Sequence, residues 1–260
     1  KGSRSQGEWR TVSGCRLDPA RRLASALQAT WPDIMGKDDN RIEEARAALA
    51  PHGLFLRGIV HFDGDGPALD EERSAKTILL VGNIGGSMWP AFARWREQSP
   101  APVDDPMDRW SDEVIRPIAD KFGGRAYFPS EKPWQPFQQW AMRAEGLKAS
   151  PLGILIHPIY GLWHGYRGAI GFADRLGTKT QPFADHPCDH CPDKPCLSTC
   201  PVDAVHALRF DVASCRDHLG TSTGTGGCRS SGCVARNACP VGADYRYGPE
   251  QLRFHMAAFR

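Results

Sequence analysis

Apolar residues in the first 175 positions alternate between helical and strand-like spacing. Residues 41–50 (RIEEARAALA) are good helix formers and end before Pro51 and Gly53, so we expect a helix there. Branched and aromatic residues dominate residues 54–62 (LFLRGIVHF), and an Asp-Gly-rich turn at 63–66 follows. This pattern predicts a strand that ends in a turn.

Other apolar runs predict further strands. Residues 77–81 (TILLV) are wholly apolar and precede glycine-rich residues 82–86, which we expect to form a turn after a buried strand. Residues 125–128 are a candidate strand, and residues 152–157 (LGILIH) have the composition of a buried one. We also predict a strand over 163–172 (WHGYRGAIGF), where glycines allow close approach of a ligand.

Three further segments are predicted to be helices. Residues 87–96 and 136–145 flank the longest of them, in which apolar residues recur at helical spacing until Gly123. Asp105 and Pro106 open this helix, because Asp is a good N-cap and proline suits the first helical position.

Mixed strands and helices predict an α+β fold with two domains. From Gly177 onward the sequence is rich in Pro, Cys, Asp and Gly and has little apolar periodicity. We place a boundary at 177–185, between a first domain at 1–180 and a second at 181–260. The second domain is expected to depend on bound metal for its stability.

The amino-acid composition is that of a folded globular protein without a membrane-spanning helix. Hydrophobic residues make up 41% and charged residues 24% of the 260 residues, which is typical of a folded globular protein. No run reaches the ~18 apolar residues of a membrane-spanning helix. The net charge is +2 with scattered basic residues, so no polyanion-binding surface is predicted. No secretory signal follows Lys1, and we expect a reducing cytoplasm.

Cysteine is the unusual residue of this chain. There are nine cysteines, and all except Cys15 lie between Cys188 and Cys239. An odd number of cysteines gathered in one stretch favours metal binding over a disulfide framework. We interpret Cys15 as a lone buried thiol.

The cysteine spacing predicts two 4Fe–4S clusters. The two groups are Cys188-x2-Cys191-x4-Cys196-x3-Cys200-Pro201, and Cys215 with Cys228-x4-Cys233-x5-Cys239-Pro240. In bacterial ferredoxins the last cysteine of such a run ligates the other cluster. With that crossing, one cluster is held by Cys188, Cys191, Cys196 and Cys239. The other cluster is then held by Cys200, Cys215, Cys228 and Cys233.

Two alternatives stay open for these cysteines. Structural zinc also uses Cys-x2-Cys, with His186, His190 or His218 as further ligands. A single cluster with spare thiols would also fit, because the second group is loosely spaced. Because clusters transfer single electrons, the N-terminal part is expected to hold an electron-accepting cofactor or to dock a partner. Its glycine-rich residues 82–86 lack the Lys-Ser/Thr of a phosphate-binding loop.

Five short motifs outside the cysteine region carry a resemblance to a known family. They are ILLVGN at 78–83, DPMDRW at 105–110, ILIHP at 154–158, GLW at 161–163 and RG at 167–168. In this order they resemble the cobalamin-processing CblC family. The resemblance implies a flavin-nitroreductase-like α/β sandwich with cobalamin in its cleft.

With the cysteine region included, the chain also resembles epoxyqueuosine reductase and the reductive dehalogenases. In those proteins a nitroreductase-like cobalamin domain is fused to a bacterial-ferredoxin-like segment with two 4Fe–4S clusters. The resemblance covers about two thirds of the chain. It implies a cytoplasmic, cobalamin-dependent iron–sulfur reductase in which the clusters pass electrons to a corrinoid in the N-terminal cleft.

The resemblance also implies catalytic residues. Asp108 falls near the catalytic acid of epoxyqueuosine reductase, Asp105 is the second candidate, and Tyr166 could donate a proton. Each of them has a structural interpretation as well. The Asp-Pro-x-Asp spacing suits a helix cap, and Tyr166 suits a buried core.

Cofactor-binding candidates follow from the same resemblance. His157 could face cobalt or a corrin amide, Trp163 could stack on a flat ring system, and Arg167 could bind a corrin carboxamide or a flavin phosphate. Alternatively, His157 is a hydrogen-bonded turn residue. Trp163 could equally be a core aromatic, and Arg167 could pair with a structural carboxylate.

Two other functions remain alternatives at this point. The chain could be a ferredoxin-type electron-transfer module that holds FMN or no second cofactor, or a carrier that processes cobalamin and hands it on. We expect a small-molecule substrate or the corrinoid itself, and a redox partner such as a flavodoxin or a ferredoxin reductase. No membrane partner is expected. Nucleic acid is not expected either, because the net charge is +2 and the helical-repeat extension of epoxyqueuosine reductase is not seen after Cys239.

Overall fold

The computed structural model describes residues 40–102, 104–177, 183 and 185–259. Contacts divide the chain into two compact units, Lys1–Ile34 and Met35–Arg260, and every described residue belongs to the second. Cys15 lies outside the described residues. The boundary predicted at 177–185 stays a prediction, since part of it is also outside the described residues.

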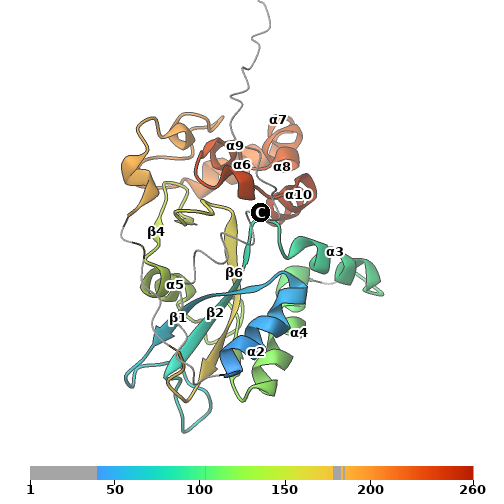
Figure 1. Ribbon diagram of the computed structural model, residues 1–260. Coiled ribbons are helices and arrows are strands. Elements are labelled where there is room, and N and C mark those ends of the chain that lie inside the picture. The colour runs from blue at the N-terminus through green and yellow to red at the C-terminus, as the bar shows by residue number, and fades with distance from the viewer. Residues whose placement is uncertain (1–39, 103, 178–182, 184, 260) are drawn as a thin grey trace, which may run out of the picture. The chain divides into compact units, whose positions relative to one another are not determined.

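An antiparallel four-stranded sheet forms the centre of this unit (Figure 1). In spatial order its strands are β1 (Phe55–His61), β2 (Thr77–Ile84), β6 (His164–Phe172) and β3 (Arg125–Tyr127). These elements confirm the strands predicted at 54–62, 125–128 and 163–172. The mixed α and β composition of the prediction is confirmed as well.

Strand β2 is longer than its sequence predicts. Gly82 and Asn83, expected in a turn, pair with Tyr166 and Gly165 of β6, so that part of the predicted turn is wrong. A Cβ atom at Gly82 would lie 2.1 Å from the carbonyl oxygen of Gly165. This glycine therefore permits close strand approach at a bulge, which is a use of glycine other than a turn.

The strand predicted at 152–157 is mostly wrong. Only Leu155–Ile156 forms a strand, β5, which pairs with β4 (Lys148–Ala149) in a separate two-stranded sheet. Gly153 has a φ of +73°, in the left-handed region that suits a turn. The apolar run is therefore buried as a turn followed by a short strand.

Helices cover both faces of the main sheet. They are α2 (Asn40–Leu49), α3 (Trp89–Gln98), α4 (Pro106–Lys121) and α5 (Phe137–Glu145), with the short η1 (Ala50–His52) after α2. Helix α5 contacts β1, and its Trp140 is buried with Ile78 and Leu80 of β2. Helix α4 contacts β6 and β3, while α2 contacts α4 and β1. Alternate strand residues thus face different helices, as the period of a strand requires.

The start of α4 differs in detail from its prediction. Asp105 occupies the N-cap position, but its side chain makes no capping hydrogen bond and its φ is +45°. Its carbonyl oxygen instead accepts backbone hydrogen bonds from Asp108 and Arg109. Backbone groups and Pro106 therefore begin this helix without the predicted side-chain cap.

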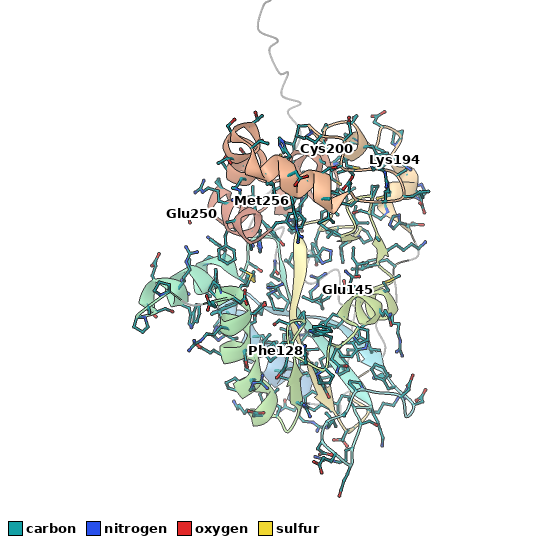
Figure 2. The ribbon with its side chains drawn as sticks, turned by 180° about the vertical axis from the view of Figure 1, so that it is seen from behind. Phe128, Glu145, Lys194, Cys200, Glu250 and Met256 are labelled. Atoms are coloured by element: carbon teal, nitrogen blue, oxygen red, sulfur yellow. The ribbon has the colours of Figure 1, made fainter. Side chains whose placement is uncertain are left out.

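The cysteine-rich segment consists of short helices joined by turns. They are η2 (Pro187–His190), η3 (Pro195–Leu197), α6 (Val212–Gly220), α7 (Ser222–Gly226), α8 (Cys228–Ser231), α9 (Val234–Ala238), η4 (Ala243–Tyr245) and α10 (Pro249–Ala258). Figure 2 shows Cys200 and Lys194 among these short elements, and Glu145 and Phe128 among the sheet and its helices. None of the helices in the described ranges has the length and apolar character needed to cross a bilayer.

Several contacts join the cysteine-rich segment to the rest of the unit, among them an aromatic cluster and a close approach of two turns. Phe254 of α10 packs against Trp89 and Phe92 of α3, with ring centroids 5.6 and 5.2 Å apart. Gly161 and Gly242 have φ values of +58° and +67°, and each lies against the backbone beside the other. The turn before β6 therefore packs closely on the turn that follows Cys239.

Candidate functional site

One set of four thiols surrounds a small cavity in the cysteine-rich segment. Cys188, Cys191, Cys196 and Cys239 all line this cavity. The pKa of Cys188 is raised to about 11 by burial and then by the charges of the other three thiols. The four sulfur atoms are thus near neighbours, although Cys239 is far from the others in sequence.

A second set of four thiols lies in the same segment. Burial, followed by the charges of Cys233, Cys200 and Cys228, raises the pKa of Cys215 to about 11. The Cys200 sulfur accepts a hydrogen bond from the backbone N–H of Ala204 at 3.3 Å. These are the members of the second set predicted from the spacing.

The two sets suit iron–sulfur clusters in the chemistry of their donors. Each set offers four cysteine sulfurs, and cubane clusters are held by four cysteine thiolates. These eight cysteines are free thiols. Ligand binding would require loss of the thiol protons. Among the described residues, no group of three or more Cys, His, Asp or Glu is arranged to hold a single metal ion.

Apolar packing supports both sets. A buried cluster that includes Ile156, Leu162 and Val205 contains Cys239, and four other thiols pack against it. Ala235 of α9 also belongs to this cluster. The thiols are therefore partly shielded from water, which for a bound cluster would influence its reduction potential.

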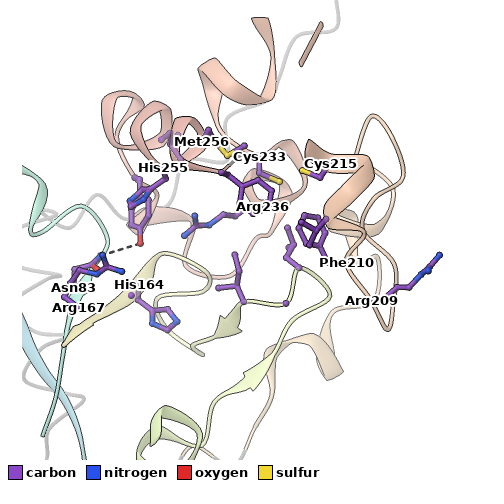
Figure 3. A pocket seen from close by; sticks show the side chains of 18 of the residues that line it. Asn83, His164, Arg167, Arg209, Phe210, Cys215, Cys233, Arg236, His255 and Met256 are labelled. Atoms are coloured by element: carbon purple, nitrogen blue, oxygen red, sulfur yellow. Dashed lines mark hydrogen bonds between the residues drawn. The ribbon is translucent and has the colours of Figure 1, made fainter. Parts of the chain in front are cut away.

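A large cavity opens between the ends of β2 and β6 and the C-terminal helices (Figure 3). Its volume of about 730 Å³ is within the range of small-molecule and cofactor sites. Cys215 and Cys233 of the second set line it. Its apolar lining consists of Met88, Leu152, Ile154, Leu208, Phe210, Val212, Leu252, Met256 and Phe259. A ligand in this cavity would therefore lie beside the second set of thiols.

The polar lining comes from elements that are distant in sequence. Asn83 of β2 donates to the carbonyl oxygen of Gly85 at 2.8 Å and to the Tyr247 hydroxyl at 3.4 Å, the latter drawn in Figure 3. His255 of α10 and Arg236 of α9 also line the cavity. The sequence alone did not indicate these residues, because only the tertiary packing of the cysteine-rich segment brings them together.

Of the six catalytic and cofactor-binding candidates, the structure places Arg167 in the cavity lining. Asp108 lies behind it, with one carboxylate oxygen 3.8 Å from the Arg167 guanidinium. Asp105 is exposed at the start of α4 and is not among the residues that line the cavity. Asp108 could therefore influence a ligand in the cavity through Arg167.

The aromatic candidates are a buried Trp163 and a partly buried Tyr166, and neither lines the cavity. Trp163 is fully buried, so a ligand in the cavity does not reach its ring faces. The Tyr166 hydroxyl donates a hydrogen bond to the Glu145 carboxylate at 3.1 Å. Burial and the negative charge of Glu145 raise the pKa of Tyr166 well above its usual value. Its proton is therefore held inside the protein.

His157 is also placed away from the cavity lining. Its Nδ1 atom accepts backbone N–H groups of Ile159 and Tyr160 at 3.0 and 3.2 Å. Burial, followed by the charges of Arg57 and His164, lowers its pKa to about 2. This geometry is that of a neutral, hydrogen-bonded turn residue, which was the structural alternative for His157.

A buried charged network lies behind the cavity. Arg57 donates to the Glu145 carboxylate and to the Asn83 carbonyl oxygen, both at 3.0 Å. His164, which lines the cavity, bonds to the Leu155 carbonyl oxygen through Nε2 at 3.0 Å. A charged residue inside the apolar strand run LFLRGIVHF was the one sequence signal for this network.

Comparisons with known proteins find distant likenesses of fold. No protein-family model matches the chain, and no curated protein matches it. Among solved structures, a Caenorhabditis elegans B12-trafficking protein CblC, a homologue of human MMACHC, is similar with 13% identity and a TM-score of 0.46. That similarity covers 83% of this chain and 91% of the other.

Epoxyqueuosine reductase from Streptococcus thermophilus is similar with 15% identity and a TM-score of 0.47, over 77% of this chain and 65% of the other. This chain thus spans slightly less than two thirds of that enzyme. A structure of epoxyqueuosine reductase with an epoxyqueuosine-modified tRNA-Tyr stem loop is similar with 14% identity and a TM-score of 0.48. It is covered over 69% of its length, and this chain over 82%.

Proposed function

We propose that this chain is an iron–sulfur oxidoreductase that passes electrons to a ligand in the large cavity. In this proposal the first set of thiols (Cys188, Cys191, Cys196, Cys239) holds one 4Fe–4S cluster. The second set (Cys200, Cys215, Cys228, Cys233) holds the other. When bound, such clusters supply electrons one at a time.

The observation that carries this proposal is the position of Cys215 and Cys233. Both belong to the second set, and both line the 730 Å³ cavity. A cluster held there would border the ligand directly, so electrons would not need to cross the sheet. The first set packs around Ile156 and Val241 and lines a different cavity, which suits a relay that receives electrons from a redox partner such as a flavodoxin.

Two features of the cavity lining affect a bound ligand. Its apolar side chains limit water around the ligand, which strengthens electrostatic interactions there. His164 lines the cavity, but its Nε2 bonds to the Leu155 carbonyl oxygen, and its Nδ1 lies 3.5 Å from the Arg57 guanidinium. Both ring nitrogens are therefore engaged within the protein, and neither is free to bind a metal in the ligand.

Cobalamin is our first choice for the ligand. The motif resemblance in the sequence supports this choice, and the broad apolar lining of the cavity suits the face of a macrocycle. Arg167 and Arg236 would hold its polar periphery. The second candidate ligand is FMN, in which case the chain would be an electron-transfer module. A third candidate function is a carrier that binds and processes cobalamin without acting on an organic substrate.

We propose a positioning role for Asp108. Its carboxylate lies 3.8 Å from the Arg167 guanidinium, outside the hydrogen-bond range but within reach of a charge interaction. In this role it orients Arg167 toward the ligand, and its replacement by Asn would change ligand affinity more than it changes stability. Asp105, exposed at the helix start, has no role in the proposal.

A cofactor titration tests the proposed function. Hydroxocobalamin is added to anaerobically reconstituted protein, and the visible absorbance bands are followed before and after reduction with dithionite. We expect saturable spectral changes, and faster reduction of bound cobalamin than of free cobalamin. A Cys215→Ala variant should lose this acceleration. The absence of any spectral change, together with stoichiometric FMN in the purified protein, would favour the electron-transfer module.

A further inference from the structure

The large cavity has a positively charged wall. Arg167 of β6 and Arg236 of α9 line it together with Tyr247 and His255, and Figure 3 labels both arginines and His255. No aspartate or glutamate is present among the described residues of the lining. Arg209 also lines the cavity, but Figure 3 shows its side chain directed away from it. A ligand in the cavity therefore meets the guanidinium groups of Arg167 and Arg236 without a carboxylate in the same wall.

Arg236 is held in place by stacking and has unused donors. Its guanidinium carbon lies 4.4 Å from the ring centroid of Trp163 and 4.8 Å from that of Tyr247. One terminal nitrogen donates to the Leu162 carbonyl oxygen, while Nε is buried without a hydrogen-bond partner among the described residues. A shielded cation with an unsatisfied donor is costly unless an anion or an acceptor binds it.

Arg167 is only partly neutralised. Its Nε donates to the Tyr166 carbonyl oxygen at 3.1 Å, and its nearest carboxylate, Asp108, lies 3.8 Å away on a partly exposed side chain. Burial lowers the pKa of this guanidinium, which indicates that its charge is poorly solvated. Its other donors are therefore free to bind an anion in the cavity.

His255 lies within the field of both arginines. Burial, followed by the charges of Arg167 and Arg236, lowers its pKa to about 4. Its ring lies 5.3 Å from that of Tyr247. At neutral pH this imidazole is uncharged, so it can hydrogen-bond an anion without adding a third cation to the wall.

We propose that Arg167 and Arg236 together bind the phosphate group of the ligand in this cavity. A guanidinium binds phosphate through two parallel N–H···O bonds. Two guanidinium groups that approach from different sides need more acceptor oxygens than the two of a carboxylate. The apolar body of the ligand would then pack against Leu252, Met256 and Phe259, near Cys215 and Cys233.

This inference rests on the proposed function only in its choice of ligand. Cobalamin and FMN both carry a phosphate group, as a diester in the first and a monoester in the second. The two sources are distinguished by matched pairs of ligands. Cobinamide lacks the phosphate-containing nucleotide of cobalamin, and riboflavin lacks the phosphate of FMN.

The direct test is a calorimetric titration of the reconstituted full chain with inorganic phosphate at constant ionic strength. We expect saturable binding at one site, and an affinity for phosphate above that for acetate. Arg167→Met and Arg236→Met should each weaken phosphate binding by about tenfold or more, because each removes charge-assisted hydrogen bonds. Arg253→Met is the matched control, since Arg253 is exposed on α10 and does not line the cavity.

Several outcomes would overturn the inference. They are no saturable phosphate binding, equal binding of acetate, or phosphate binding that is unchanged in Arg167→Met. The Arg167→Met variant decides the matter even if loss of the stacked Arg236 prevents folding. The preference for cobalamin over cobinamide, or for FMN over riboflavin, should also disappear in Arg167→Met. Phosphate binding by protein that takes up no iron would contradict the proposed function and leave this site in place.

Discussion

The guanidinium of Arg57 and the carboxylate of Glu145 form a buried ion pair, with 3.0 Å between nitrogen and oxygen and no more than 5% of either side chain exposed. Arg57 is on β1 and Glu145 ends α5. The pair therefore joins the sheet to a covering helix. Tyr166 also donates to Glu145, so the network reaches β6, the strand that carries Arg167.

Loss of one partner of this pair should destabilise the protein strongly. Arg57→Met leaves the Glu145 carboxylate buried without its cation, and such changes cost about 3–5 kcal/mol. Urea unfolding monitored by circular dichroism measures this. The control is Arg73→Met, which removes an exposed pair with Asp70 and should cost much less than Arg57→Met, because water screens exposed ion pairs. Equal effects of the two variants would show that the buried network is not a major source of stability.

The contact between Gly161 and Gly242 should be necessary for the first set of thiols. A Cβ atom at Gly161 would lie 1.9 Å from the carbonyl oxygen of Val241, so Gly161→Ala must displace the turn after Cys239. We expect lower stability and loss of iron from the first set. Unfolding and iron content are measured together.

Gly153→Ala is the matched control for that substitution. Gly153 also has a positive φ, +73°, but nothing lies within 4 Å of the Cβ position. The Gly153→Ala variant should therefore lose only about 1–2 kcal/mol of unfolding free energy, the amount that a left-handed backbone costs alanine, and it should keep its iron. If Gly161→Ala behaves like Gly153→Ala, the close backbone contact has no role in holding the thiols.

Acid should destabilise the fold through His157. Its pKa is about 2 in the folded protein and about 6.5 in an unfolded chain. Above pH 6.5 it is neutral in both states and has no effect. Below pH 6.5 the unfolded chain binds one more proton, so the free energy of unfolding falls by about 1.4 kcal/mol per pH unit for this group.

Urea unfolding at pH 7, 6 and 5 checks this dependence on His157. His157→Asn keeps an acceptor for the backbone N–H groups of Ile159 and Tyr160 but cannot titrate. In this variant we expect the free energy of unfolding to fall less steeply as the pH is lowered. The difference in slope should correspond to about one bound proton. His164, whose pKa is also lowered by burial, should continue to contribute in both proteins. Identical slopes would show that His157 is not kept neutral in the folded state.

Local chemistry made part of this architecture predictable. The strand at 54–62 follows from its branched and aromatic residues, and the helix at 41–50 follows from its helix formers and the Pro51 and Gly53 that end it. Short turns bring Cys188, Cys191 and Cys196 close together, whereas Cys239 joins them only through the tertiary fold. The sequence predicted a turn at Gly82, but this residue lies within β2, because it is needed where Gly165 of β6 comes close.

The cavity could be predicted only in part. Polar and aromatic residue types do not reveal whether a side chain lines a cavity or lies in the core. Of these candidates Arg167 lines the cavity, whereas Trp163 and Tyr166 do not. Arg236 and His255 carry no local signal. Their place in the wall is a consequence of how α9 and α10 pack near the ends of β2 and β6.

Each single cysteine substitution should remove the cluster that its set of thiols would hold and leave the other cluster in place. Cys239→Ala and Cys188→Ala should remove the same cluster, although these residues are far apart in sequence. Cys200→Ala should remove the other, although Cys200 is close to Cys196. Electron paramagnetic resonance of the reduced variants identifies the surviving cluster. If Cys200→Ala and Cys188→Ala leave the same spectrum, the crossing between the two groups is wrong.

The most direct measurement is the iron, acid-labile sulfide and zinc content of the anaerobically purified chain. Two cubane clusters predict about eight iron and eight sulfide per chain, without zinc. One or two zinc ions per chain with no sulfide would contradict the account, as would thiols paired in disulfides.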